Sequence, residues 1–225
     1  MSKEKKVKNK IKRKTTGLDI FSRIITALAA IAVPAAAYFA NMIYYVFEST
    51  VFQIIAKIKG DTTDDGSTYG YLSIRKVVEE YLPLIRSLSP EEKSSSVLSV
   101  IEPVKTALIC TGVLFAVAIL CAVVIFFISC FSNSNKLPLA FSFVGLACTF
   151  AMAFAFRAAT APFVAGDITI GDFLKNELLG AIAPYVASIS TLNLSTAWIT
   201  MLVIFAAIFI WHGAQLVVSI GEKNK

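Results

Sequence analysis

The chain has little charge and lacks the residue sets that build catalytic centres. Only 16% of its 225 residues are charged and it has a single histidine, whereas a soluble domain carries about 25% charged residues. It shows no serine–histidine–aspartate set, no phosphate-binding glycine loop and no carboxylate pair within its apolar blocks. The sequence therefore predicts a protein that is not an enzyme and that holds no cofactor and no metal.

Cysteine is also scarce, and its positions argue against a disulfide framework. Cys110, Cys121, Cys130 and Cys148 all lie within or beside long apolar blocks. No two of them form a close-set metal-binding pair such as C-x-x-C. Buried thiols that pack as small apolar side chains account for all four.

Long apolar blocks without acidic residues are what the sequence does contain. Hydrophobic residues make up 56% of the chain, and the mean hydropathy is +0.72. A helix needs about 20 mostly apolar residues to cross a bilayer, and four blocks reach that length: 24–47, 104–131, 137–156 and 197–220. We therefore predict an all-α fold, an integral membrane four-helix bundle with short amphipathic helices in its two extracytoplasmic segments.

These blocks divide the chain into spans and the segments between them. The expected order is a basic cytoplasmic tail (1–19), a first span (20–47), an extracytoplasmic segment (48–103), a second span (104–131), a cytoplasmic turn (132–136), a third span (137–158), a second extracytoplasmic segment (159–196), a fourth span (197–220) and a cytoplasmic tail (221–225).

The basic tail sets the expected orientation. Residues 1–14 hold eight Lys or Arg, one Glu and no aromatic residue. Lys and Arg close to a span remain on the cytoplasmic side, so we place both termini inside a multi-pass protein of the plasma membrane. The tail has no aromatic residues that could stack on bases and no folded nucleic-acid-binding domain, so it does not indicate a nucleic-acid partner.

The start of the chain also has the pattern of a secretion signal. Basic residues precede "IITALAAIAV", and "PAAA" offers a small-residue cleavage site after Ala37. The apolar run nevertheless continues through "YFANMIYYVF", which is long enough for a full span. We therefore expect an uncleaved signal anchor.

The two extracytoplasmic segments contain apolar residues at helical spacing. In "SIRKVVEEYLPLIRSL" the positions are Ile74, Val77, Tyr81, Ile85 and Leu88. Arg75 and Glu79 form an i,i+4 pair on the polar side. In "GDFLKNELLGAIAPYV" the apolar positions are Phe173, Leu174, Leu178 and Ile182. Such helices cover the bundle, lie in the headgroup layer or bind a partner.

Polar side chains at membrane depth are the candidate functional residues, because charges there are costly and are usually paired or functional. Arg157 is expected to form an ion pair with Glu48 or Glu102 at a similar depth. The candidate polar residues are Asn41, Arg157, His212 and Gln215.

Small residues at every fourth position predict close helix packing. Ridges of this kind are Ala32, Ala36 and Ala40 in the first span and Ala147, Ala151, Ala155 and Ala159 in the third.

Two functions fit these features. The first is an interaction, accessory or scaffold subunit that works through its extracytoplasmic helices, with the lipid bilayer and a membrane protein or a second copy as partners. The alternative is a small oligomeric channel or transporter subunit that uses the four polar residues.

Overall fold

The computed structural model describes residues 17–50, 54, 67–81, 102–132, 134–169 and 188–221. This part of the chain is mostly helical, and four of its helices are long and apolar enough to cross a membrane. They are α1 (Gly17–Phe39), α7 (Lys105–Phe131), α8 (Lys136–Ala165) and α10 (Thr196–Gly221).

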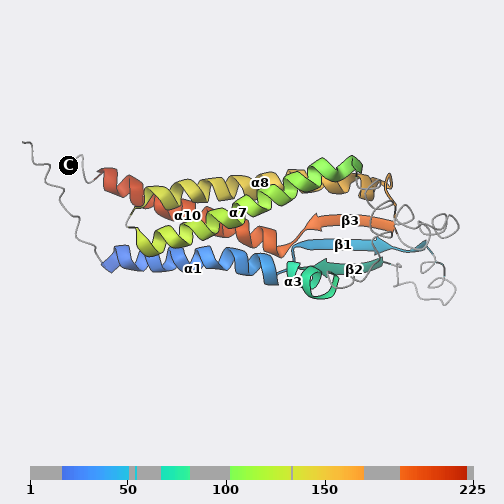
Figure 1. Ribbon diagram of the computed structural model, residues 1–225, viewed down its shortest axis with the longest axis horizontal. Helices are drawn as coiled ribbons and strands as arrows, with labels where there is room; N and C mark the ends of the chain where they lie inside the picture. The colour runs from blue at the N-terminus through green and yellow to red at the C-terminus, as the bar shows by residue number, and fades with distance from the viewer. Residues whose placement is uncertain are drawn as a thin grey trace, which may run out of the picture.

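The four long helices pack side by side along the length of the molecule (Figure 1). Both α1 and α8 pack against α7 and α10. The α7–α8 hairpin has 27 and 30 residues in its two arms, against 23 in α1. The end of the hairpin away from its turn extends past the ends of α1 and α10 and runs beside the strands (Figure 1).

Polarity in these helices is reversed relative to a soluble protein. Large apolar side chains cover the outward faces, among them Leu28, Leu120, Phe127, Phe150, Phe154, Ile199, Val203, Ile210 and Val217. The buried positions include Ser22, Thr26, Ser129, Ser142, Thr149, Thr160 and His212. Burial is tolerated because the hydroxyls bond locally: Thr26 donates to the Ser22 carbonyl at 2.9 Å and Thr149 to the Gly145 carbonyl at 2.7 Å.

Small side chains and a few large ones fill the centre of the four helices. The cluster consists of Ala30, Val33, Ala37, Ala118, Cys121, Ala122, Ile125, Met201, Phe205 and Ile208. Gly145 lies against this cluster, and a Cβ atom there would overlap the fully buried ring of Phe205. The close approach of α8 and α10 therefore depends on residue 145 being a glycine, which has no side chain.

The predicted alanine ridges are displaced from the observed packing faces. On α8, Ala147 is exposed, Ala151 and Ala155 are half-buried, and only Ala159 lies in the buried stripe. On α1, Ala32 and Ala36 are half-buried, as is Ala40 just after the helix ends, and the stripe instead runs through Ser22, Thr26, Ala30, Val33 and Ala37. A search for alanine alone misses these faces, because serine, threonine and glycine serve the same close packing.

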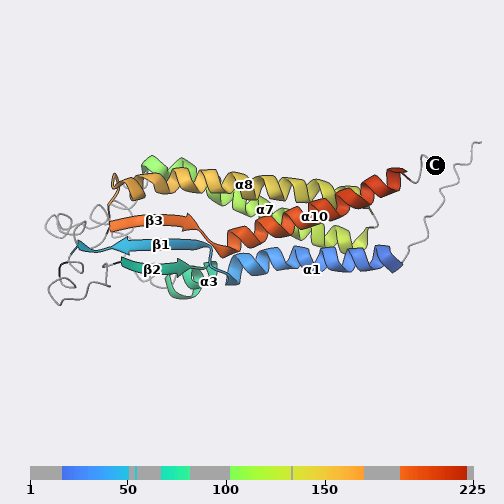
Figure 2. The same ribbon diagram turned by 180° about the vertical axis from the view of Figure 1, so that it is seen from behind.

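A three-stranded antiparallel sheet stands at one end of the helices, and it corrects the all-α prediction. Its strands are β1 (Ile43–Glu48), β2 (Ser67–Leu72) and β3 (Ser188–Leu194), in the order β2-β1-β3. The sheet continues from α1 and α10 (Figure 2). The central strand has the sequence "IYYVFE", and aromatic and β-branched residues of this kind favour strands.

The first helix is accordingly shorter than the predicted span 20–47. It ends at Phe39, and the chain enters β1 four residues later. Backbone bonds hold the junction: Ser195 N–H donates to the Met42 carbonyl at 2.8 Å and Ala197 N–H to the Asn41 carbonyl at 2.9 Å. The apolar content of β1 had made it indistinguishable from a continuing span.

A short helical stretch follows β2. It consists of α3 (Ile74–Lys76) and η1 (Val77–Tyr81), and Ser73 caps it by accepting a bond from Lys76 N–H at 3.2 Å. The predicted Arg75–Glu79 pair is confirmed at 2.9 Å. The remainder of this predicted helix, with Ile85 and Leu88, and the one expected at 173–182 lie outside the described residues.

Replacing Gly145 tests the helix packing. We expect Gly145→Ala to lower the free energy of unfolding by about 1–3 kcal/mol, the usual effect of added atoms in a packed core. Reversible unfolding in mixed detergent micelles measures the change.

The matched control is Gly112→Ala on α7, where a Cβ atom meets nothing within 4 Å. Alanine also favours helices there, so stability should stay level or rise. Adding Phe205→Leu to Gly145→Ala should recover part of the loss. Equal stabilities for the two alanine variants would contradict this account.

Candidate functional site

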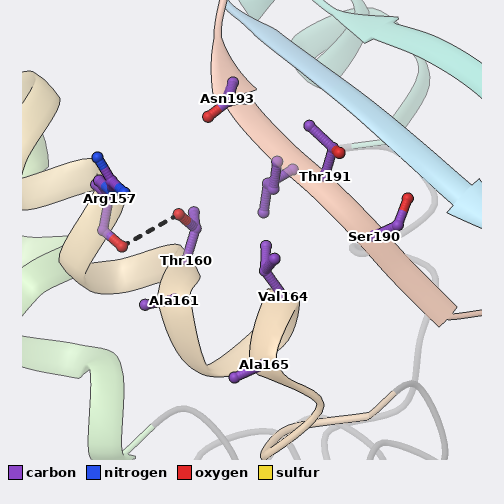
Figure 3. Close-up of a pocket in the computed structure, with 9 residues that line it drawn as sticks. Arg157, Thr160, Ala161, Val164, Ala165, Ser190, Thr191 and Asn193 are labelled. Atoms are coloured by element: carbon purple, nitrogen blue, oxygen red, sulfur yellow. Dashed lines mark hydrogen bonds between the residues drawn. The ribbon is translucent and has the colours of Figure 1, made fainter.

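An open pocket lies between the C-terminal part of α8 and the edge strand β3, at the end of the molecule that carries the sheet (Figure 3). We call it the outer pocket. Its volume is about 580 Å³, within the range of about 300–1,000 Å³ that ligand sites usually have. The lining residues are Arg157, Thr160, Ala161, Val164, Ala165, Ser190, Thr191, Leu192 and Asn193.

A bulge in β3 shapes one wall of the outer pocket. Val46 pairs with Thr191, but Phe47 pairs with Ile189, so Ser190 is the extra residue of β3. The Ser190 hydroxyl donates to the Val46 carbonyl at 3.4 Å. Bulges bend a strand and redirect its side chains, and this one places Ser190 at the boundary of the outer pocket and a second hollow.

The second hollow lies where α8 ends. Gly166 terminates the helix with φ +81°, a left-handed conformation that glycine adopts without strain. The hollow has a volume of about 270 Å³ and shares Val164, Ala165 and Ser190 with the outer pocket. It brings Glu48, from the end of β1, to the same face of the molecule.

Arg157 gives the outer pocket its charge. Its side chain is exposed, and within the described residues no ion pair joins it to Glu48 or Glu102. Glu102 instead contacts Lys105 at 3.2 Å. The structure thus places Arg157 in a pocket and separates it from both carboxylates that sequence reasoning offered as partners.

Aromatic side chains gather on one face of the sheet. The ring of Tyr44 stacks on Tyr69 with centroids 6.4 Å apart and contacts Tyr71 at 5.2 Å. Tyr69 is 61% exposed and Tyr71 is 47% exposed. Partial burial raises the pKa of the Tyr44 hydroxyl, and Tyr69 and Tyr71 raise this pKa further. Tyr44 therefore stays neutral at pH 7, and we call Tyr44, Tyr69 and Tyr71 the tyrosine face.

A second polar group joins α1 to α10 at the opposite end of the molecule. Trp211 Nε1–H and the Gln215 amide both donate to the Ser22 hydroxyl oxygen at 2.8 Å. His212 Nε2 lies 3.0 Å from Thr26 Oγ1. We call these residues the inner polar cluster.

The hydrogen bonds of the inner polar cluster define the tautomer of His212. Thr26 uses its only proton for the Ser22 carbonyl, so it must accept a bond from His212 Nε2–H. Nδ1 is then an unprotonated acceptor, buried and without a partner among the described residues. The predicted pair His212 and Gln215 thus belongs to one contact between helices.

Arg23 extends this contact to a third helix. Its Nε donates to the Ser129 carbonyl at 2.8 Å, and a terminal nitrogen donates to the Cys130 carbonyl at 2.5 Å. These carbonyls belong to the last turn of α7, where a cation compensates the helix dipole.

Sequence reasoning found His212 and Gln215 but missed Ser22, Arg23 and Thr26. Their spacing on α1 was a usable signal, because Ser22 and Thr26 are one turn apart. Of the other candidates, Asn41 holds the helix–strand junction through its carbonyl. The four predicted polar residues therefore lie at three separate places.

Comparison with protein-family models, curated proteins and solved structures gives no match for this chain.

Removing the shared acceptor tests the inner polar cluster. Ser22→Ala leaves the Trp211 and Gln215 donors without their acceptor, and two interhelical bonds of this kind contribute about 1 kcal/mol in membrane proteins. We expect that loss in detergent unfolding, together with a changed indole N–H resonance of Trp211. Ser219→Ala is the control, because that hydroxyl bonds only the nearby Leu216 carbonyl. Identical behaviour of the two variants would disprove the role of Ser22.

Proposed function

We propose that the chain is a four-pass integral membrane protein without catalytic activity, whose four long helices form a bundle in the bilayer. The outward faces of all four helices support this, since large apolar side chains cover them and the polar groups turn inward. Water would penalise such a surface, whereas hydrocarbon does not.

The proposed orientation places both termini in the cytoplasm of a plasma membrane. The basic residues of 1–14 support it through the positive-inside rule. Lys136 at the α7–α8 turn lies at the same end of the helices and has the same sign of charge. The sheet and the outer pocket then face outward.

We further propose that the protein is an interaction or accessory subunit that binds another membrane protein through its extracytoplasmic part. The tyrosine face is the observation that carries this proposal. Tyrosine is enriched at protein interfaces, where a rigid ring buries much area at little entropic cost. Junctions of a few residues to α1 and α10 hold the sheet rigidly and thus favour a defined docking surface.

An oligomeric channel or transporter subunit draws less support from the same residues. His212 and Gln215 lie at one end of the helices, and Arg157 and Asn41 lie toward the other. Between the two ends the centre is filled by fully buried side chains of Ile125, Met201 and Phe205. A conduit would therefore have to form between copies.

Cysteine labelling tests the orientation. In a variant with the four native cysteines replaced, we expect Tyr69→Cys to react with a membrane-impermeant maleimide added to intact cells. Ser134→Cys, in the α7–α8 turn, should react only after permeabilisation. The reverse pattern would invert the topology, and equal labelling of both from outside would contradict a four-pass arrangement.

Photocrosslinking tests the interaction. With benzoylphenylalanine in place of Tyr69 or Tyr71, we expect one protein adduct of fixed mass and stoichiometry in native membranes. Phe154, which is 64% exposed on the outward face of α8, is the control position and should give none. An adduct with twice the mass of the chain would favour the oligomeric alternative. No adduct at either tyrosine would refute docking at the tyrosine face.

A further inference from the structure

The outer pocket contains a cation and hydrogen-bond donors that no described residue uses. The Arg157 guanidinium forms no hydrogen bond or ion pair with the residues that the structure describes, and the same is true of the Asn193 amide. Arg157 and Asn193 lie at one end of the pocket, and Ser190 lies toward the other (Figure 3). The unused donors of Arg157 and Asn193 point to an anion.

The distance of Arg157 from the start of α10 sets its depth in the proposed membrane. Trp198, in the first turn of α10, donates to the Thr149 carbonyl at 2.7 Å. Arg157 lies eight residues further along α8, which is about 12 Å at 1.5 Å per residue. With the hydrocarbon layer ending near the start of α10, a polar layer of about 5–8 Å on each side of the bilayer ends short of the Arg157 backbone. The long Arg157 side chain must then extend back toward the membrane to reach a lipid headgroup.

We propose that the outer pocket binds a phosphate-ester anion, which is either the headgroup of an anionic phospholipid or a soluble phosphate ester. Arg157 pairs with the phosphate oxygens, because the planar guanidinium can donate two parallel bonds to them. The Asn193 amide supplies a further donor from β3. The lipid form of this proposal rests on the membrane placement proposed above, and the soluble form does not.

The remaining lining fits the rest of such a molecule. Val164 and Leu192 give the pocket apolar lining, and the small side chains of Ala161 and Ala165 leave room in it. A volume of about 580 Å³ accommodates a glycerophosphate group as well as the phosphate. The open side of the pocket would let acyl chains continue along the apolar face of α8.

Binding to the purified full-length chain tests the proposal. Native mass spectrometry from a zwitterionic detergent measures retention of phosphatidylglycerol, and calorimetric titration measures binding of glycerol 3-phosphate. We expect Arg157→Gln to weaken binding about tenfold or more, which is the effect of losing charge-assisted bonds. Arg157→Lys should fall between, because an ammonium group cannot form the two-bond contact. Asn193→Ala should weaken binding less than Arg157→Gln.

The control is Lys136→Gln, which removes the same charge at the other end of α8 and should leave binding unchanged. Retention of phosphatidylglycerol without binding of glycerol 3-phosphate assigns the site to a lipid, and binding of both assigns it to a soluble ester. The proposal is overturned if the wild-type chain binds neither ligand. It is also overturned if the Arg157→Gln variant binds as tightly as the wild type does. If Arg157→Gln misfolds, the Arg157→Lys variant is judged by the same criterion. Labelling at Tyr69→Cys and Ser134→Cys reports the membrane placement separately.

Discussion

Backbone hydrogen bonding at the junction between the helices and the sheet determines where the sheet lies relative to α1 and α10. Where α1 ends, its chain must pair at once with another segment, because unpaired N–H and C=O groups are costly in apolar surroundings. The segment that leads into α10 provides these partners through Ser195 and Ala197. The same bonds set the register of β1 against β3 and bring β3 alongside α8, so the outer pocket exists only because the junction is formed.

The inner polar cluster and the outer pocket lie at opposite ends of the four long helices, and a cluster of buried apolar side chains lies between them. At the inner end, Ser22, Thr26 and His212 join α1 to α10 through hydrogen bonds, and His212 Nδ1 is the one buried side-chain atom of these three residues that has no partner among the described residues. At the outer end, Arg157 has no such partner among the described residues. A satisfied buried network stabilises a fold, whereas an unsatisfied cation in an open pocket is available to a ligand. This contrast is why we assign structure to the inner end and binding to the outer one.

Particular residues show how far sequence reasoning reached. Local patterns were informative: the four long helices follow from apolar blocks, and the Arg75–Glu79 pair follows from i,i+4 spacing. His212 and Gln215 were found because they share a helix face. Their partners Ser22 and Thr26 were missed. The one-turn spacing of these two residues marks a shared face of α1, but it does not identify contacts with residues about 190 positions away. The bulge at Ser190 was equally invisible, since it is defined only against Val46 and Phe47 of another strand.

The sequence by itself determined that the chain has four long apolar helices and where its charges lie, because hydrophobic length and charge depend on composition within a short window. Only the tertiary structure decided that residues 43–48 form a strand. An apolar, aromatic segment suits both the end of a membrane helix and the centre of a sheet, and β1 became a strand because β2 and β3 supply hydrogen-bond partners on both of its edges. Those partners come from segments far along the chain, so long-range pairing chose between two locally acceptable conformations.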